Sequence, residues 1–263
     1  MMIGAVAGDI IGSVYEFDNH RSVDFPLFTE SSTFTDDSVL TFATAAVLLG
    51  KGEYAAAYQD FARRYRGRGY GGNFYRWIYT DDPKPYNSYG NGSAMRVSPV
   101  GFAFDSLEET LAEARRSAEV THNHPEGIKG AQATAQVIFM SRKGASKAEI
   151  KREINQRYGY DLSRSLEHIR EVNQFNATCQ GSLPEAISVF LAGEDYEHTI
   201  RLAVSIGGDT DTIACIAGGM AQAFYGSIPA GIAREVRARL SAEFLQFLDA
   251  FQNRFPAASP LLH

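Results

Sequence analysis

The chain has 263 residues, 44% of them hydrophobic and 21% charged, which is the composition of a folded globular protein rather than a disordered one. A formal net charge of −6 argues against a general nucleic-acid groove, and the densest basic stretch, residues 63–68, is short enough to be a helix end. Two cysteines are too few for a disulfide framework.

The N-terminal segment is apolar, but its pattern does not fit a targeting signal. No Lys or Arg precedes it, and Asp9 and Glu16 interrupt it. This pattern argues against a secretory signal, and no apolar stretch is long enough to span a membrane. We therefore expect a cytoplasmic protein without a membrane partner.

Helical periodicity recurs along the chain, whereas alternating β-branched runs are almost absent. The first half predicts helices at 3–15, 37–49, 53–66 and 107–120, with loops at 69–73 and 81–92. The second half predicts helices at 125–140, 146–158 and 184–192, one from 195, one at 210–224, and a pair after 229. No composition shift marks a linker, so we expect residues 1–263 to form one compact all-α domain.

Two short acidic motifs each precede a predicted helix: FTDDS at 34–38 and GGDTDT at 207–212. Helix capping explains either one alone, because Asp and Thr at a helix start accept hydrogen bonds from free N–H groups. Each motif nevertheless has two carboxylates where a cap needs one, and such like charges repel unless a cation neutralises them. Hard oxygen ligands suit Mg²⁺, Mn²⁺ or Ca²⁺ rather than zinc, and the spacing is not that of an EF-hand. Together the motifs suggest a shared two-metal site.

The helices next to these motifs strengthen the case. Residues 213–221 are apolar nearly all round and rich in Ala and Gly, so this helix should be central and closely approached by others. In the first helix, Asp9, Ser13 and Glu16 share one face at helical spacing. A solvated face is the alternative explanation for that acidic stripe.

Six motifs in order resemble the ADP-ribosylglycohydrolase family, which includes the dinitrogenase reductase-activating glycohydrolases and the jellyfish J-type crystallins. They are GAVAGD at 4–9 continuing through Glu16, FTDDS at 34–38, GNGSAMR at 90–96, THNHP at 121–125, SLPEA at 182–186 and GGDTDT at 207–212. The resemblance covers roughly residues 3–226. It implies a compact orthogonal helical bundle of the ADP-ribosylglycohydrolase type.

The resemblance also implies roles for individual residues. A pair of Mg²⁺ ions, sometimes Mn²⁺, would be held by Thr35, Asp36, Asp37, Asp209, Asp211 and Thr212. Glu16 matches a glutamate with a proposed catalytic or gating role, so it is the first choice for the acid/base and Asp36 the second. The ADP-ribose pocket would be lined by Asn91, Gly92, Ser93, Met95 and His122.

Simpler explanations exist for part of this set. Asn91-Gly92 is also an ordinary turn dipeptide, and His122 and His124 could cap the helix that starts at Pro125. A zinc site at these histidines is disfavoured, because no cysteine or third histidine lies nearby in the sequence.

The implied reaction is hydrolysis of the glycosidic bond between ADP-ribose and a protein or small-molecule acceptor. Loop N–H groups and helix N-termini would bind the pyrophosphate, with 71–72 and 90–93 as candidates. Two alternatives remain: a non-catalytic ADP-ribose-binding or crystallin-like structural protein, and a two-metal phosphoesterase. Release of ADP-ribose rather than AMP would distinguish hydrolysis of the glycosidic bond from phosphoesterase activity. No motif indicates the acceptor or the oligomeric state.

Overall fold

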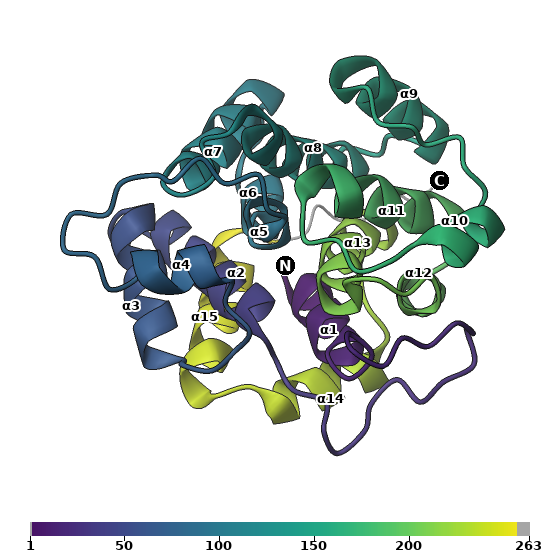
Figure 1. The fold of residues 1–263 in the computed structure, drawn as a ribbon, viewed down its shortest axis with the longest axis horizontal. Coiled ribbons are helices and arrows are strands. Elements are labelled where there is room, and N and C mark those ends of the chain that lie inside the picture. The colour runs from purple at the N-terminus through teal and green to yellow at the C-terminus, as the bar shows by residue number, and fades with distance from the viewer. Residues whose placement is uncertain (1, 257–263) are drawn as a thin grey trace.

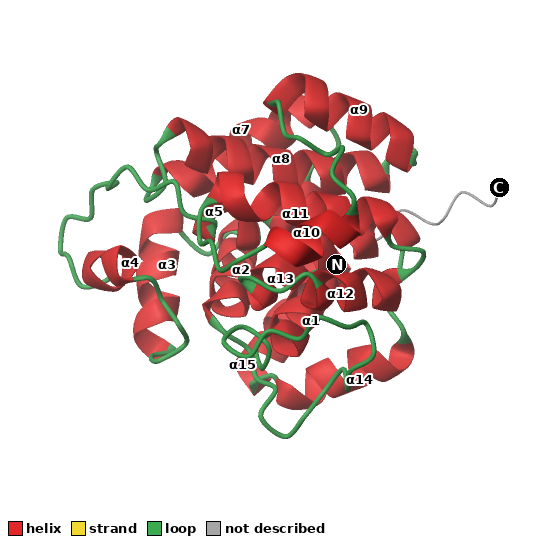
Figure 2. Cartoon of the chain, turned by 45° about the vertical axis from the view of Figure 1, so that its right-hand side comes forward, coloured by secondary structure: helices red, strands yellow, loops and turns green. Residues whose placement is uncertain are grey.

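The computed structural model describes residues 2–256, and within that range the chain folds into helices joined by loops (Figures 1 and 2). The helices are α1 (Ile3–Gly12), α2 (Asp36–Leu48), α3 (Tyr54–Arg64), α4 (Gly72–Trp77), α5 (Gly92–Met95), α6 (Ser98–Ala103), α7 (Leu107–Glu119), α8 (Pro125–Arg142), α9 (Lys147–Tyr158), α10 (Leu166–Val172), α11 (Cys179–Ala192), α12 (Tyr196–Ser205), α13 (Thr210–Tyr225), α14 (Ala230–Arg239) and α15 (Ala242–Arg254). The all-α prediction is confirmed. None of these helices is long and apolar enough to cross a membrane.

Several helix boundaries differ from those predicted. The first helix ends at Gly12 rather than near residue 15, and α3 ends at Arg64, before the rest of the basic stretch. The prediction that Pro184 begins a helix is wrong, because α11 starts five residues earlier at Cys179 and contains Pro184 in its interior. Thr178 stabilises this earlier start, since its hydroxyl accepts a hydrogen bond from the Gly181 N–H. The short helices α4, α5, α6 and α10 were not predicted, because one or two turns carry too little periodicity.

Helix α13 lies at the centre of the molecule, and α1 packs along it (Figure 1). Three glycines spaced four residues apart make this contact possible: a Cβ on Gly4, Gly8 or Gly12 would lie 2.0–2.7 Å from atoms of α13. At Gly8 the clash would be with the backbone of Ala214, which cannot move aside. The prediction of a central helix whose small residues allow close approach is confirmed. The two chain segments that carry Asp9 and Asp211 therefore lie side by side.

The C-terminal helix α15 closes the core around α2 and α3 (Figure 1). Phe244 is fully buried and stacks on Phe42 of α2, with ring centroids 4.2 Å apart. It also stacks on Tyr65, which follows α3, at 4.4 Å. These contacts fix the orientation of α2, whose first turn faces the other acidic motif.

Candidate functional site

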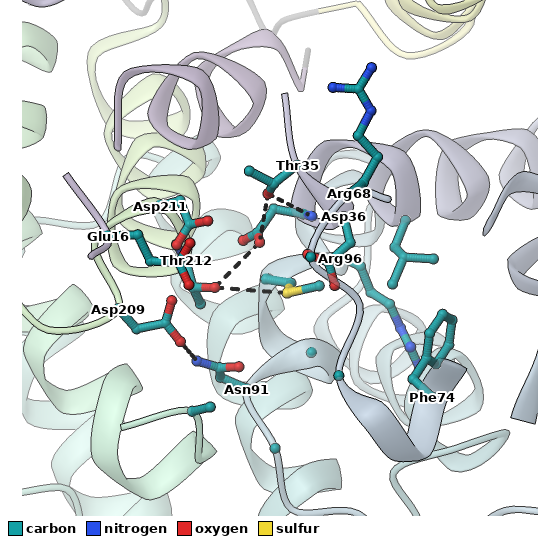
Figure 3. A pocket seen from close by; sticks show the side chains of 18 of the residues that line it. Glu16, Thr35, Asp36, Arg68, Phe74, Asn91, Arg96, Asp209, Asp211 and Thr212 are labelled. Carbon is teal, nitrogen blue, oxygen red and sulfur yellow. Dashed lines mark hydrogen bonds between the residues drawn. The ribbon is translucent and has the colours of Figure 1, made fainter. Parts of the chain in front are cut away.

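A cavity of about 590 Å³ lies where the first turns of α2 and α13 meet (Figure 3). Residues 67–74, which include the first turn of α4, the loop residues 86–91 and the short helix α5 form much of the rest of its wall. Its volume falls in the roughly 300–1,000 Å³ range of small-molecule sites. Both acidic motifs of the sequence contribute side chains to its lining.

Asp9 of α1 fixes the start of α2. Its carboxylate is fully buried and accepts hydrogen bonds from the Thr35 N–H at 3.0 Å, the Thr35 hydroxyl at 2.7 Å and the Ser38 N–H at 3.1 Å, and also from the Ser38 hydroxyl. This anion therefore occupies the N-terminal end of α2, where the helix dipole also favours it. The sequence placed Asp9 on an acidic face without assigning it a role. The available signal was a carboxylate in a helix made otherwise of small and apolar residues.

A glycine turn fixes the start of α13. Gly207 and Gly208 have φ angles of 66° and 83°, a left-handed conformation that side chains disfavour. The side chain of Asn173 donates to the Gly207 carbonyl at 2.8 Å, and that of Asn19 accepts from the Gly208 N–H at 2.8 Å. The next residue, Asp209, is thereby brought to the cavity wall.

Carboxylates from both ends of the chain converge at one side of the cavity. One oxygen atom from each of Asp9, Asp37 and Asp211 lies within 4.8 Å of the others, and the same holds for Glu16, Asp209 and Asp211. The two groups share Asp211. In Figure 3, Glu16, Asp209 and Asp211 face Thr35 and Asp36 across the cavity.

No protein cation pairs directly with this cluster in the part of the chain that the structure describes. Within residues 2–256 none of these carboxylates forms a salt bridge. Burial, and then repulsion by neighbouring carboxylates, raises the pKa of Asp37 and Asp211 well above the usual range. The same two causes raise the pKa of Glu16 to about 7. One buried oxygen of Asp37 also has no hydrogen-bond partner. Such a cluster fits a divalent metal ion, which would supply the missing positive charge.

Other residues predicted as metal ligands have defined places in the structure. The Thr212 hydroxyl donates to an Asp37 oxygen at 3.3 Å, and the Thr35 oxygen, whose hydrogen goes to Asp9, accepts from the Asp37 N–H at 3.3 Å. Asp36 lines the same cavity but belongs to neither of the two oxygen groups. Its backbone N–H donates to the Arg68 carbonyl at 2.8 Å, so the loop after α3 holds it in place.

Four of the five residues predicted to line a ligand pocket do line the cavity: Asn91, Gly92, Met95 and His122. Asn91 also donates from its side-chain amide to an Asp209 oxygen at 2.7 Å, which orients that carboxylate. Ser93 is not part of the lining. Its hydroxyl donates to the Gly127 carbonyl at 2.7 Å, so it joins α5 to α8.

The structure adds cavity residues that were not predicted. Arg68 belongs to the basic stretch expected to end a helix, yet it follows α3 and lines the cavity. Phe175 comes from a segment with no strong pattern, and Arg96 is only the last residue of a motif. Spacing offered no signal for Arg68 or Phe175. For Arg96, a lone arginine after an apolar helix turn was the available signal.

Comparison with known proteins decides the family. The family model described as ADP-ribosylglycohydrolase matches residues 1–259. The chain belongs to the ADP-ribosylglycohydrolase family. This confirms the resemblance drawn from the six motifs, and with it the prediction of an enzyme class and of the fold type.

Individual relatives agree with this assignment. The chain is 28% identical to the ADP-ribosylhydrolase ARH3 of Homo sapiens and 27% identical to that of Mus musculus, covering 86% of this chain in both cases and 84% and 82% of those proteins. It is 27% identical to the ADP-ribosylarginine hydrolase Tri1 of Pseudomonas putida, covering 86% and 69%. A solved structure titled "ADP-ribosylglycohydrolase-related protein complex" superposes with a TM-score of 0.74 at 26% identity, covering 96% of this chain and 95% of that one.

Proposed function

We propose that this protein hydrolyses the glycosidic bond between ADP-ribose and an acceptor, with two Mg²⁺ ions, or Mn²⁺ in their place, held by the carboxylate cluster. The observation that carries this proposal is the convergence on one cavity of acidic side chains from the segment after α1, from α2 and from the start of α13, none of which forms a salt bridge with a described residue. Membership of the ADP-ribosylglycohydrolase family supports cleavage of a glycosidic bond. The names of the relatives support an ADP-ribosylated substrate.

The donor set supports hard divalent cations. The ligand atoms would be the carboxylate oxygens of Asp36, Asp37, Asp209 and Asp211, with the hydroxyls of Thr35 and Thr212 completing the set. Asp211 lies near Asp37 in one oxygen group and near Asp209 in the other, which suits two neighbouring ions with Asp211 between them. When bound, such a pair would supply charge for orienting the vicinal hydroxyls of the distal ribose and would lower the pKa of a water molecule.

Glu16 is the first candidate for moving the proton. It is half-buried at the rim of the carboxylate cluster, where burial raises its pKa, and a carboxylate with a raised pKa can both accept and return a proton near neutral pH. We propose that Glu16 accepts the proton of the water that attacks the anomeric carbon, and that Asp36 is the second candidate for this role. The acceptor then leaves with the electron pair of the broken bond and takes up the proton that Glu16 received from the water.

The remainder of the cavity would bind ADP-ribose. Asn91, Gly92, Met95 and His122 lie along its wall next to the aromatic rings of Phe74 and Tyr86, which offer apolar faces to a planar base. The proposed binding of ADP-ribose in this cavity requires neither a second subunit nor a nucleic-acid groove. The proposed partner is an ADP-ribosylated protein or small molecule.

The test is a panel of ADP-ribosylated acceptors, including arginine-, serine- and nucleotide-linked ones, assayed with Mg²⁺ and after chelation. We expect release of free ADP-ribose from at least one acceptor in Mg²⁺ only, and a loss of about 100-fold or more in Asp211→Asn. The matched control, Asp81→Asn, changes an exposed aspartate outside the cavity and should keep wild-type activity. Release of AMP instead would indicate a phosphoesterase, and equal activity in Asp211→Asn would contradict the metal assignment.

A further inference from the structure

Arg96 is a buried cation without an acidic partner beside the cavity. Its side chain has no solvent exposure, and its guanidinium lies 4.0 Å from the centroid of the Tyr58 ring. One nitrogen, Nη2, donates to the Ser117 carbonyl and to the Thr121 hydroxyl, both at 2.8 Å. The other two nitrogens have no hydrogen-bond partner, and Arg96 forms no salt bridge with the described residues. Burying a charge without an ionic partner is costly, and the Tyr58 ring and the two hydrogen bonds of Nη2 offset only part of this cost.

The Thr121 hydroxyl links the Arg96 guanidinium to the His122 ring through hydrogen bonds. The Thr121 oxygen lies 2.7 Å from Nδ1 of the His122 ring, and both residues are buried. A guanidinium can only donate, so the Thr121 oxygen accepts from Arg96 and keeps one hydrogen to give away. Nδ1 is its only acceptor among the described residues. If Nδ1 carried the proton instead, a fully buried hydroxyl hydrogen would have no acceptor, which is unfavourable.

The opposite ring nitrogen, Nε2, faces the cavity wall formed by the 90–92 loop. A Cβ on Gly92 would lie 3.2 Å from Nε2, and one on Gly90 would lie 3.5 Å from it. No hydrogen-bond partner for Nε2 is found among residues 2–256. Burial, and then the charge of Arg96, lowers the pKa of His122 well below its usual value, so the ring is neutral at physiological pH.

We propose that Arg96 and Thr121 are positioning residues that hold His122 in the tautomer with its proton on Nε2, so that this N–H donates to a phosphate oxygen of bound ADP-ribose. The proposal rests on the proposed function for the identity of the ligand. In Figure 3, Arg96 lies across the cavity from Glu16, Asp209 and Asp211. The acidic side of the cavity would therefore favour cations. The side next to Arg96 has buried positive charge and would favour an anion. Glycines at 90 and 92 leave the Nε2 atom accessible.

The tautomer itself can be measured without any ligand. Long-range ¹H–¹⁵N NMR on the full chain with labelled histidine distinguishes a protonated from an unprotonated ring nitrogen, and His122→Gln identifies the signals of this residue. We expect a protonated Nε2 and an unprotonated Nδ1 at neutral pH. A proton on Nδ1, or a charged ring, would overturn the proposal whether or not the protein proves to hydrolyse ADP-ribose.

The effect on binding is tested by calorimetry with ADP-ribose in the presence of Mg²⁺. Thr121→Val removes the hydroxyl at nearly constant shape, and we expect it to weaken binding about tenfold, while Thr121→Ser restores wild-type affinity. Thr134→Val is the matched control, because Thr134 is a buried threonine of α8 whose hydroxyl has no partner. The ³¹P signals of bound ADP-ribose should shift between wild type and Thr121→Val. Unchanged affinity in Thr121→Val, or unchanged ³¹P signals, would contradict the proposal.

Discussion

At the scale of one residue, the burial of the Asp37 carboxylate lowers the stability of the fold. It is buried, one of its oxygens has no hydrogen-bond partner, and it faces other carboxylates without a protein cation. Because its pKa is raised, the ionised form disfavours the folded state, and this cost grows as the pH rises above the ordinary value for aspartate. A bound cation would remove the cost.

Asp37→Asn should therefore have opposite effects on the metal-free and metal-bound protein. Without metal, we expect the variant to be more stable than the wild type by about 0.5–2 kcal/mol at pH 7, because the repulsion is gone and an amide oxygen can still accept from Thr212. With Mg²⁺ the wild type should gain stability and the variant should not. Urea unfolding with and without Mg²⁺ measures both effects. Asp81→Asn is the exposed control, and a less stable metal-free Asp37→Asn would contradict this account.

At the scale of elements, the site depends on how closely α1 approaches α13. Gly8 faces the Ala214 backbone, and the next residue, Asp9, holds the start of α2 through four hydrogen bonds. One helix contact therefore places both acidic motifs. Any separation of α1 from α13 would move Asp9 and Asp211 apart.

Gly8→Ala tests this dependence. A Cβ at this position would lie 2.0 Å from the Ala214 carbonyl oxygen, so we expect a loss of about 1–3 kcal/mol in the free energy of unfolding, despite the better helix propensity of alanine. Gly231→Ala in α14 is the matched control, since nothing lies within 4 Å of its Cβ position and it should be neutral or slightly stabilising. Denaturant unfolding of both variants measures the difference. Equal stability of Gly8→Ala and wild type would show that the helices can separate at no cost.

Elements with strong local signals were predictable from the sequence, and those set by distant contacts were not. The starts of α2 and α13 were found, because acidic and hydroxyl residues before an apolar run are a local signal. The start of α11 was missed, because Pro184 is a helix-start signal and the true start depends on the Thr178 cap. The role of Asp9 was missed as well, since its partners lie 26 and 29 residues away.

At the scale of the whole molecule, the N-terminal and C-terminal parts of the chain complete one cavity. From the N-terminal part, Glu16 comes from the segment just after α1 and Asp37 from α2. From the C-terminal part, Asp209 comes from the turn before α13 and Asp211 from α13 itself. The family match likewise spans both parts of the chain, over residues 1–259. These carboxylates could share divalent cations only in the folded molecule, because no one segment carries all of them.

The most direct test is anomalous diffraction from crystals of the full chain grown in Mn²⁺, which scatters anomalously and accepts the same oxygen ligands as Mg²⁺. We predict two anomalous peaks inside the cavity, with the oxygens of Asp37, Asp209 and Asp211 as ligands and Asp211 close to both. A cavity without an anomalous peak, with Asp37 and Asp211 turned away from each other, would contradict the account.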